Sequence, residues 1–214
     1  EWYRILEKED VGEGSRLLVI DDGSKDETFQ ILNGMKEGRP KLLAVTKPNS
    51  GHGATLLYGY RYALKEGADY IFQTDSDGQT RPEEFRGFWK LRANYDMVIG
   101  NRSKRQDGWT RIFVTKVLKL AIRVCFGVKV TDANTPFRLM DAKALKKQMK
   151  YIPKEFNLPN VLIAVIYKKK KMKTKYIPIT FRARQGGVNS INLKKICGIG
   201  AKAFRDFIVI NRVI

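Results

Sequence analysis

Short apolar runs that end at polar or glycine-rich corners alternate with segments of helical periodicity in the first half of the chain. This alternation is typical of βαβ units, in which a helix connects two parallel strands. Helices are predicted to start near Asp26, to run from the loop at 47–53 to about Glu66, and to start again at Pro82. We therefore predict an α/β fold with a mostly parallel sheet flanked by helices. The predicted strands cover residues 16–20, 41–46, 69–74 and 96–100.

The pattern is less regular after residue 101. Apolar periodicity predicts helices at 111–126 and 158–168, and short apolar runs predict strands at 137–140 and 173–181. Over residues 190–214, apolar residues recur every three or four positions with Lys and Arg between them, which predicts a basic amphipathic helix. No internal repeat and no linker-like stretch interrupts the sequence. Residues 1–214 are therefore predicted to form one domain.

Basic residues are concentrated in the second part of the chain. The formal net charge is +19, whereas residues 1–100 alone hold slightly more acidic than basic side chains. This asymmetry predicts that the basic part faces a polyanion, namely nucleic acid, anionic lipid headgroups or a phosphorylated substrate; a solvated basic face is the alternative. The region has no signature of an RNA-recognition motif, a helix-turn-helix or a zinc site, so nucleic acid is not expected as a partner.

Two further classes of protein are not expected. The longest apolar run, residues 161–167, is far shorter than the roughly 18 residues that a membrane span needs. Cys125 and Cys197 are far apart and form no CxxC pair, which argues against a disulfide framework and a zinc knuckle.

Two carboxylates follow the third predicted strand. In open α/β sheets, ligands bind beyond the carboxyl ends of the strands. Asp75 and Asp77 are spaced so that both can converge on one hard cation, and Gln79 is close enough to add an oxygen or a hydrogen bond. Oxygen ligands suit Mg²⁺ or Mn²⁺, which commonly bridge to substrate phosphates. Because Asp is frequent in turns, an ordinary turn is the alternative.

A second acidic corner follows the first predicted strand. Asp21 and Asp22 can accept hydrogen bonds from the base or ribose of a nucleotide, although a turn, or a helix cap made by Asp26, is an equal alternative. The glycines of the loop at 49–53 let a backbone approach a ligand closely, but this loop lacks the Lys-Ser/Thr ending of a P-loop. His52, the sole histidine, is expected to be structural or exposed.

Five sequence blocks carry a resemblance to a known family. In chain order they are VIDDGSKDET, NSGHGATLLYGYRYALKEGADYIFQTDSDGQ, VIGNR, TDANTPFRLM and ITFRARQGGVNSIN. They resemble the inverting family 2 glycosyltransferases of the Rossmann-like GT-A fold, and most closely the polyprenyl-phosphate and dolichyl-phosphate sugar transferases. That family begins with an apolar strand ending in a Pro-x-Tyr/Phe-Asn-Glu corner. Nothing before Glu1 supplies it, so the first strand of the family is expected to be missing.

The resemblance implies a donor site and a metal site. The residues implied to bind a nucleotide-sugar donor are Asp22, Asp75, Arg102 and Arg184. Mg²⁺ or Mn²⁺ would be held by Asp75 and Asp77, with Asp77 as the direct ligand and Gln79 in support.

The resemblance also implies two catalytic positions. Arg138 would bind the diphosphate or the acceptor phosphate, and Asp132 would lie near the acceptor. If the acceptor is a sugar hydroxyl, a general base is required and Asp132 is the candidate. If the acceptor is a lipid monophosphate, its oxygen is already ionised near neutral pH and no strong base is needed.

The expected function is metal-dependent, inverting transfer of a sugar from a nucleotide-diphosphate sugar to a polyprenyl phosphate. The lysine-rich segment at 168–175 and the C-terminal helix are expected to lie against an anionic membrane surface, so the protein would be cytoplasmic and peripheral on the cytoplasmic face of the membrane. Two alternatives remain: a family 2 transferase that acts on a glycan hydroxyl, and a non-catalytic basic domain that binds nucleic acid or membranes.

Overall fold

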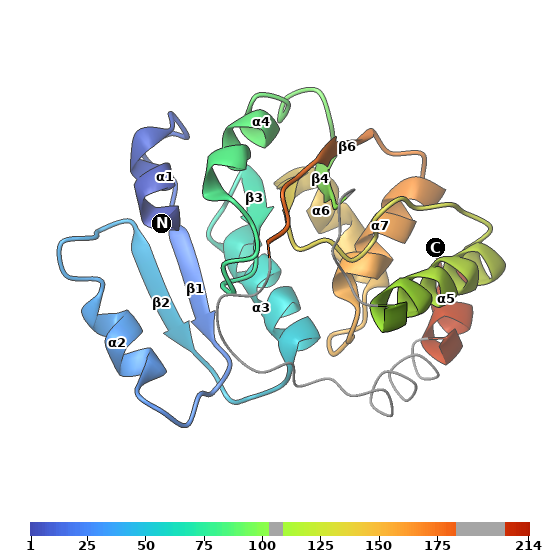
Figure 1. Cartoon of the computed structure of the whole chain (residues 1–214), viewed down its shortest axis with the longest axis horizontal. Coiled ribbons are helices and arrows are strands. Elements are labelled where there is room, and N and C mark those ends of the chain that lie inside the picture. Colours follow the sequence, from blue (N-terminus) through green and yellow to red (C-terminus); the bar gives the residue numbers. More distant parts are fainter. Residues whose placement is uncertain (103–108, 183–203) are drawn as a thin grey trace. The chain divides into compact units, whose positions relative to one another are not determined.

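The structure is a computed structural model that describes residues 1–102, 109–182 and 204–214, with the side chains of 109–113 excluded. Its backbone divides into two compact units, which are traced in Figure 1. The first unit comprises residues 1–68 and 154–157, and the second comprises residues 69–153 and 158–214. The expectation of a single catalytic domain stays a prediction.

The first unit holds a parallel pair of strands. Its elements are α1 (Trp2–Lys8), β1 (Leu17–Asp21), α2 (Thr28–Gly34), β2 (Leu42–Thr46) and α3 (His52–Lys65). The register runs from Leu17 opposite Leu42 to Asp21 opposite Thr46, so the two strands end at the same edge. Both strands and both later helices are confirmed, whereas the sequence pattern did not predict α1.

Gly53, in the first turn of α3, explains why residues 154–157 belong to the first unit. A Cβ atom at this position would lie 2.3 Å from the carbonyl oxygen of Phe156 and 2.7 Å from that of Asn157. Only glycine therefore allows the 156–157 backbone to approach the start of α3 this closely.

The second unit contains a four-stranded sheet and the remaining helices. Its elements are β3 (Tyr70–Gln73), η1 (Pro82–Glu84), α4 (Phe85–Trp89), β4 (Met97–Asn101), α5 (Trp109–Phe126), β5 (Arg138–Asp141), α6 (Ala142–Gln148), η2 (Met149–Tyr151), α7 (Pro159–Lys169) and β6 (Thr174–Pro178). Residues 204–211 are also helical, whereas residues 212–214, which the predicted helix included, are not. Residues 190–203 of that predicted helix lie outside the described residues.

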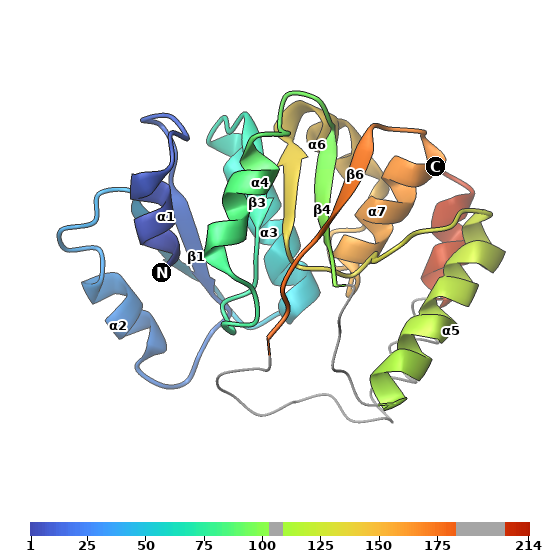
Figure 2. The ribbon, with the colours of Figure 1, turned by 45° about the horizontal axis from the view of Figure 1, so that its top comes forward.

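The α/β fold is confirmed, but the strand directions are mixed. In the order β3-β5-β4-β6, β4 and β6 are parallel, while β5 runs antiparallel to both of its neighbours. Figure 2 shows β5, β4 and β6 side by side. The sequence could not predict this direction, because an apolar run of four residues carries no information about which way its strand runs.

The core of the second unit is built on α7 and a group of aromatic rings. Every residue of α7 from Pro159 to Tyr167 is buried, as its nearly continuous apolar sequence requires. Phe72 of β3 meets Phe85 and Phe137 edge-on at centroid distances of 4.9 and 4.8 Å. Such pairs add to the roughly 1.5–3 kcal/mol that burying one large apolar side chain contributes.

Strand register brings the ends of three strands to one edge of this sheet. Arg138, which begins β5, pairs with Gln73 at the end of β3 and with Ile99 near the end of β4. The loops that follow β3 and β4 therefore start from the same edge as β5. These loops contain the acidic residues at 75–77 and Arg102.

Candidate functional site

Asp21, in the first unit, has a structural role. Its carboxylate is buried and accepts hydrogen bonds from the Ser24 amide at 3.2 Å and from the Thr46 hydroxyl at 2.7 Å. Hydrogen bonds from Ser24 and then Thr46 lower the pKa of Asp21. Asp21 thus joins the corner after β1 to the end of β2. These contacts agree with the alternative in which Asp21 belongs to a turn and does not bind a nucleotide.

Asp22 joins the same corner to the loop before α3. Its carboxylate forms an ion pair with Lys47 and accepts hydrogen bonds from the amides of Ser50 at 3.0 Å and Gly51 at 2.9 Å. Burial opposes the charge, but hydrogen bonds from Lys47 and Ser50 outweigh it and lower the pKa of Asp22. The side chain keeps 24% of its surface exposed. The predicted contact of Asp22 with a nucleotide stays a prediction.

The loop that contains Asp75 and Asp77 follows β3 and is partly exposed. Both aspartates are half-buried, while Ser76 between them is exposed. The Gln79 amide donates to Oδ1 of Asp77 at 3.1 Å, and Gly78 between them has φ of +70°. This turn fixes the direction of the Asp77 carboxylate while leaving it in reach of solvent.

Residues 181–182 hold the acidic loop in place. Nε2 of Gln79 donates to the Arg182 carbonyl at 3.0 Å, and the Arg182 amide donates back to the Gln79 carbonyl at 2.8 Å. Thr80 and Phe181 form an isolated antiparallel bridge beside them. Phe181 and Arg182 had no predicted site role, although both lie in the ITFRARQGG block, which was the available signal.

The donor set at this loop fits a hard divalent cation. Asp75 and Asp77 offer carboxylate oxygens, and the hydrogen bond from Nε2 of Gln79 orients its amide with the oxygen on the other side. Within the described residues, no group of three or more His, Cys, Asp or Glu side chains is placed to hold a metal ion. A cation here would therefore need ligands from water or substrate, as is usual for Mg²⁺.

Arg102 and Asp132, which were predicted to have separate roles, form a nearly buried ion pair. Arg102 donates from Nε to Oδ2 at 2.8 Å and from Nη2 to Oδ1 at 2.7 Å, and its backbone amide also donates to Oδ2 at 3.2 Å. The side chains expose 8% and 10% of their surface. Burial would raise the pKa of Asp132, but the bonds and the charge of Arg102 outweigh it and lower the pKa to about 2.

Arg138 lies inside the protein. Its guanidinium is fully buried and donates to the carbonyl oxygens of Thr135, Ala133 and Asn160 at 2.6 to 3.1 Å. These bonds hold the segment that follows Asp132 against the start of α7. The predicted contact of Arg138 with a phosphate stays a prediction, and Arg184 lies outside the described residues.

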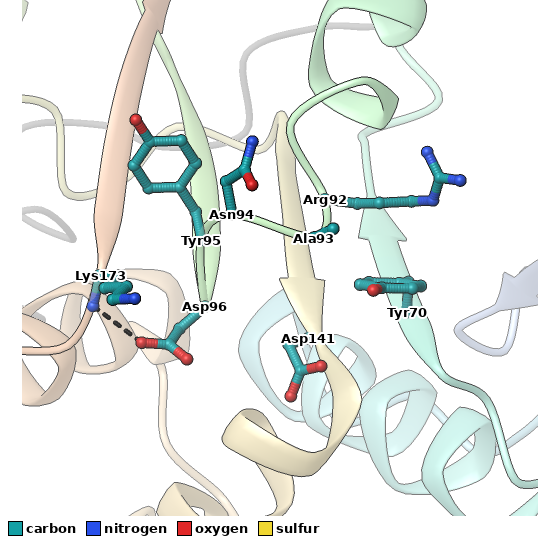
Figure 3. Close-up of a pocket in the computed structure, with 8 residues that line it drawn as sticks. All are labelled: Tyr70, Arg92, Ala93, Asn94, Tyr95, Asp96, Asp141 and Lys173. Carbon is teal, nitrogen blue, oxygen red and sulfur yellow. Dashed lines mark hydrogen bonds between the residues drawn. The ribbon is translucent and has the colours of Figure 1, made fainter.

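A pocket of about 170 Å³ lies at the opposite ends of the same strands. The residues that line it are Tyr70, Arg92, Ala93, Asn94, Tyr95, Asp96, Asp141 and Lys173 (Figure 3). Figure 3 shows the Asp96 carboxylate accepting a hydrogen bond from Lys173, at 2.8 Å from the backbone amide. Both carboxylates have internal roles, because Asp141 caps α6 through the Ala144 amide at 2.6 Å. The pocket therefore does not coincide with the candidate site residues.

Comparisons with known proteins identify a family. The family described as glycosyl transferase family 2 matches residues 8–149. A polyprenol monophosphomannose synthase of Mycolicibacterium smegmatis is 30% identical over 139 residues, which cover 61% of this chain and 52% of the relative. An undecaprenyl-phosphate 4-deoxy-4-formamido-L-arabinose transferase of Pseudomonas syringae is 30% identical over 146 residues, which cover 64% of this chain and 42% of the relative. The chain thus spans about half the length, or less, of these two relatives.

The fold has a counterpart among solved structures. Glucosyl-3-phosphoglycerate synthase of Mycobacterium tuberculosis, in complex with Mn²⁺, uridine diphosphate and glucosyl-3-phosphoglycerate, aligns with a TM-score of 0.65 and 14% identity. The alignment covers 99% of this chain and 75% of that chain. At this identity the likeness shows the shared fold alone.

Proposed function

Because the chain belongs to glycosyltransferase family 2, we propose that it transfers a sugar from a nucleotide-diphosphate sugar to a polyprenyl phosphate with the help of Mg²⁺ or Mn²⁺. Two relatives named for polyprenol and undecaprenyl phosphate acceptors support the acceptor class. A neighbour solved with Mn²⁺ and uridine diphosphate supports the donor class and the metal. The observation that carries the proposal is the acidic loop at 75–79, held at the sheet edge from which Arg102 also extends.

The proposed roles follow from charge. Asp77, with Asp75 and Gln79, would hold the cation, and Arg102 and Arg184 would bind the donor diphosphate. When bound, a divalent ion supplies positive charge that stabilises the departing nucleotide diphosphate. An oxygen of the acceptor phosphate forms a bond to the anomeric carbon from the opposite face, while the bond to the diphosphate breaks and its electron pair leaves with the diphosphate. The configuration at that carbon is thereby inverted.

The state of Asp132 favours a phosphate acceptor over a hydroxyl acceptor. A general base works best when its pKa lies near the working pH, and a carboxylate with a pKa of about 2 is a weak base. Both of its oxygens already accept hydrogen bonds from Arg102. A lipid monophosphate arrives ionised, so its attack needs no base at this position. We therefore place the glycan-hydroxyl alternative second.

We further propose peripheral association with the cytoplasmic face of a membrane. Within the described residues, no helix is long and apolar enough to cross a bilayer. On α5, apolar side chains are exposed beside basic ones: Val117, Leu120 and Val124 beside Lys116, Lys119 and Arg123. Phe207, from the helix at 204–211, meets Phe126 of α5 with ring centroids 5.2 Å apart, and Figures 1 and 2 draw the two helices side by side.

Two lysines of the basic segment at 168–175 contact other parts of the protein. Lys169 donates to the Asn211 carbonyl at 3.2 Å, and Lys170 donates to the Ile214 carbonyl at 3.4 Å and lies over the ring of Tyr151. These lysines tie down the C-terminal segment, so the mixed apolar and basic face of α5 is the stronger candidate for contact with lipid headgroups.

The proposal is tested by nucleotide binding. We expect UDP or GDP, added with MnCl₂, to raise the thermal unfolding midpoint of the chain by several degrees, since a ligand bound only to the folded state stabilises it. EDTA and the substitution Asp77→Asn should each abolish the shift, whereas the matched control Asp96→Asn, at the other end of β4, should keep it. No shift with any nucleotide at millimolar concentration would contradict the donor assignment.

The acceptor class is tested by radiolabelled sugar transfer. With the donor found by binding, we expect label in undecaprenyl or dolichyl phosphate and none in soluble oligosaccharides. Label found only in oligosaccharides would replace the lipid-phosphate proposal with the hydroxyl alternative.

A further inference from the structure

The contact between Arg102 and Asp132 uses a particular edge of the guanidinium. Nε and Nη2 face the carboxylate, which is the side-on arrangement of a bidentate pair. Because the guanidinium is planar and has five N–H donors, its end-on edge, formed by Nη1 and the outer hydrogen of Nη2, points away from Asp132. That edge has the geometry to meet a phosphate with two parallel hydrogen bonds.

Asp132 restrains the backbone of Arg102 as well as its side chain. Oδ2 accepts from the backbone amide of Arg102 and from its Nε at the same time. One carboxylate therefore fixes both ends of the flexible arginine side chain. The remaining rotations change the direction of the end-on edge little unless this pair is broken.

The loop that carries Asp132 is itself held rigidly. The buried guanidinium of Arg138 binds the carbonyl oxygens of Ala133 and Thr135 on this loop and that of Asn160 on α7. Asp132 is thus anchored to the core of the second unit.

A third contact relates Arg102 to the acidic loop. The guanidinium carbon of Arg102 lies 5.0 Å from the centre of the Phe181 ring. Phe181 is bridged to Thr80, and its neighbour Arg182 exchanges hydrogen bonds with Gln79. Phe181 therefore contacts the guanidinium and is also joined, through Thr80, to the end of the loop that contains Asp77.

We infer that Asp132 is a positioning residue, which aims the end-on edge of Arg102 at the diphosphate of the donor, with Phe181 as the second support. This inference rests on the proposed function and deepens it, because it assigns Asp132 to the donor site instead of to proton removal from an acceptor.

The inference predicts whether the substitution Asp132→Asn weakens or strengthens the binding of a nucleotide diphosphate. Asp132→Asn removes a negative charge beside Arg102, so if charge alone mattered, the variant would bind nucleotide diphosphate more tightly. If Asp132 aims Arg102, binding weakens. We expect the dissociation constant for UDP or GDP with MnCl₂, measured by titration calorimetry, to rise about tenfold.

Coupling to Arg102 separates positioning from a general loss of structure. Arg102→Lys keeps the charge but loses the planar fork, and we expect it to weaken binding about as much as Asp132→Asn. The double variant should be little worse than either single one, because both changes remove the same interaction. Asp96→Asn, which also removes a carboxylate that accepts a backbone amide, should bind within about twofold of the unchanged chain.

Further measurements keep the test decisive if Asp132→Asn folds poorly. Phe181→Leu leaves the ion pair intact and should weaken binding about threefold, with its folding checked by thermal unfolding. In variants that still transfer sugar, the positioning role of Asp132 predicts a raised KM for the donor and an unchanged dependence of the rate on pH. If Asp132 were a general base, Asp132→Asn would instead lower kcat and leave nucleotide binding unchanged.

Each outcome has a distinct meaning. If the unchanged chain binds no nucleotide, the proposed function fails and this inference fails with it. If the unchanged chain binds but Asp132→Asn binds equally well or more tightly, the inference is wrong and the proposed function stands. Additive effects of the Asp132 and Arg102 substitutions would also overturn it.

Discussion

At the scale of single residues, the charge of Asp132 links stability to pH. Its pKa is about 2 in the folded protein, below the ordinary value of 3.8. A carboxyl group with a lowered folded pKa contributes stability that is present above its unfolded pKa and lost as the pH falls through its folded pKa. This contribution is about 2 kcal/mol at neutral pH.

We therefore expect the free energy of unfolding to decrease between about pH 5 and pH 2, and to decrease less in Asp132→Asn, which has no group to protonate there. Urea denaturation at a series of pH values measures both curves. Glu37→Gln, at an exposed carboxylate, is the control for acid titration at the surface. If the free energy of unfolding fell equally with pH in the unchanged chain and in Asp132→Asn, the lowered pKa of Asp132 would be contradicted.

The sequence identified chemically important residues but not their partners. Asp21 and Asp22 were equivalent candidates, since both can cap, turn or bind. In an extended strand, neighbouring side chains point to opposite faces, so Asp21 turns inward to Thr46 while Asp22 reaches Ser50 and Gly51. Sequence separation of 25 or more residues hides such contacts from any local pattern.

At the scale of elements, α7 supports the second unit from within. Ile163 lies at its centre and has no exposed surface. We expect Ile163→Ala to lower the free energy of unfolding by about 2–5 kcal/mol, because the cavity adds to the lost apolar burial. Urea denaturation measures the loss.

A matched apolar truncation on α5 provides the control. Val124 exposes 67% of its surface, so Val124→Ala should change the free energy of unfolding by no more than about 0.5 kcal/mol. Equal losses for both substitutions would mean that α7 is not the buried support described here.

Periodicity predicted the elements better than their pairing. The strands β1 to β4 and the helices α3, α5 and α7 lie where apolar spacing placed them, because that spacing directly reflects which face is buried. The direction of β5 was not predictable. It depends on how the chain returns from α5 to Arg138, and no residue in that return has a local preference that decides the direction.

At the scale of the whole molecule, net charge and exposed apolar surface both favour contact with anionic lipid. We expect the chain to sediment with vesicles that contain phosphatidylglycerol, less with pure phosphatidylcholine, and less at high salt, since each nearby Lys or Arg contributes about 1 kcal/mol. The combined substitution Val117→Ser, Leu120→Ser and Val124→Ser should weaken this binding about tenfold or more.

Exposed apolar residues in α2 and directly after it supply the control for this experiment. Ile31 and Met35 expose 57% and 49% of their surface. The substitutions Ile31→Ser and Met35→Ser should leave vesicle binding unchanged. Equal binding to neutral vesicles would refute the electrostatic contribution, and full binding by the α5 variant would refute the proposed surface.

Composition predicted the basic character of the second part but not the division of the chain. Residues 154–157 belong to the first unit although they lie far along the sequence from the rest of it. Gly53 is a local trace of this arrangement, but a single glycine in a helix is not sufficient to predict which distant backbone approaches it.

The buried guanidinium of Arg138 has a consequence for hydrogen exchange. Opening any one of its hydrogen bonds to Ala133, Thr135 and Asn160 would leave an N–H donor of a buried cation unpaired, which is costly. The buried residues Ala133 and Thr135 should therefore exchange their amide hydrogens for deuterium mainly when the second unit unfolds globally. A loop without regular secondary structure would then belong to the last part of the molecule to open.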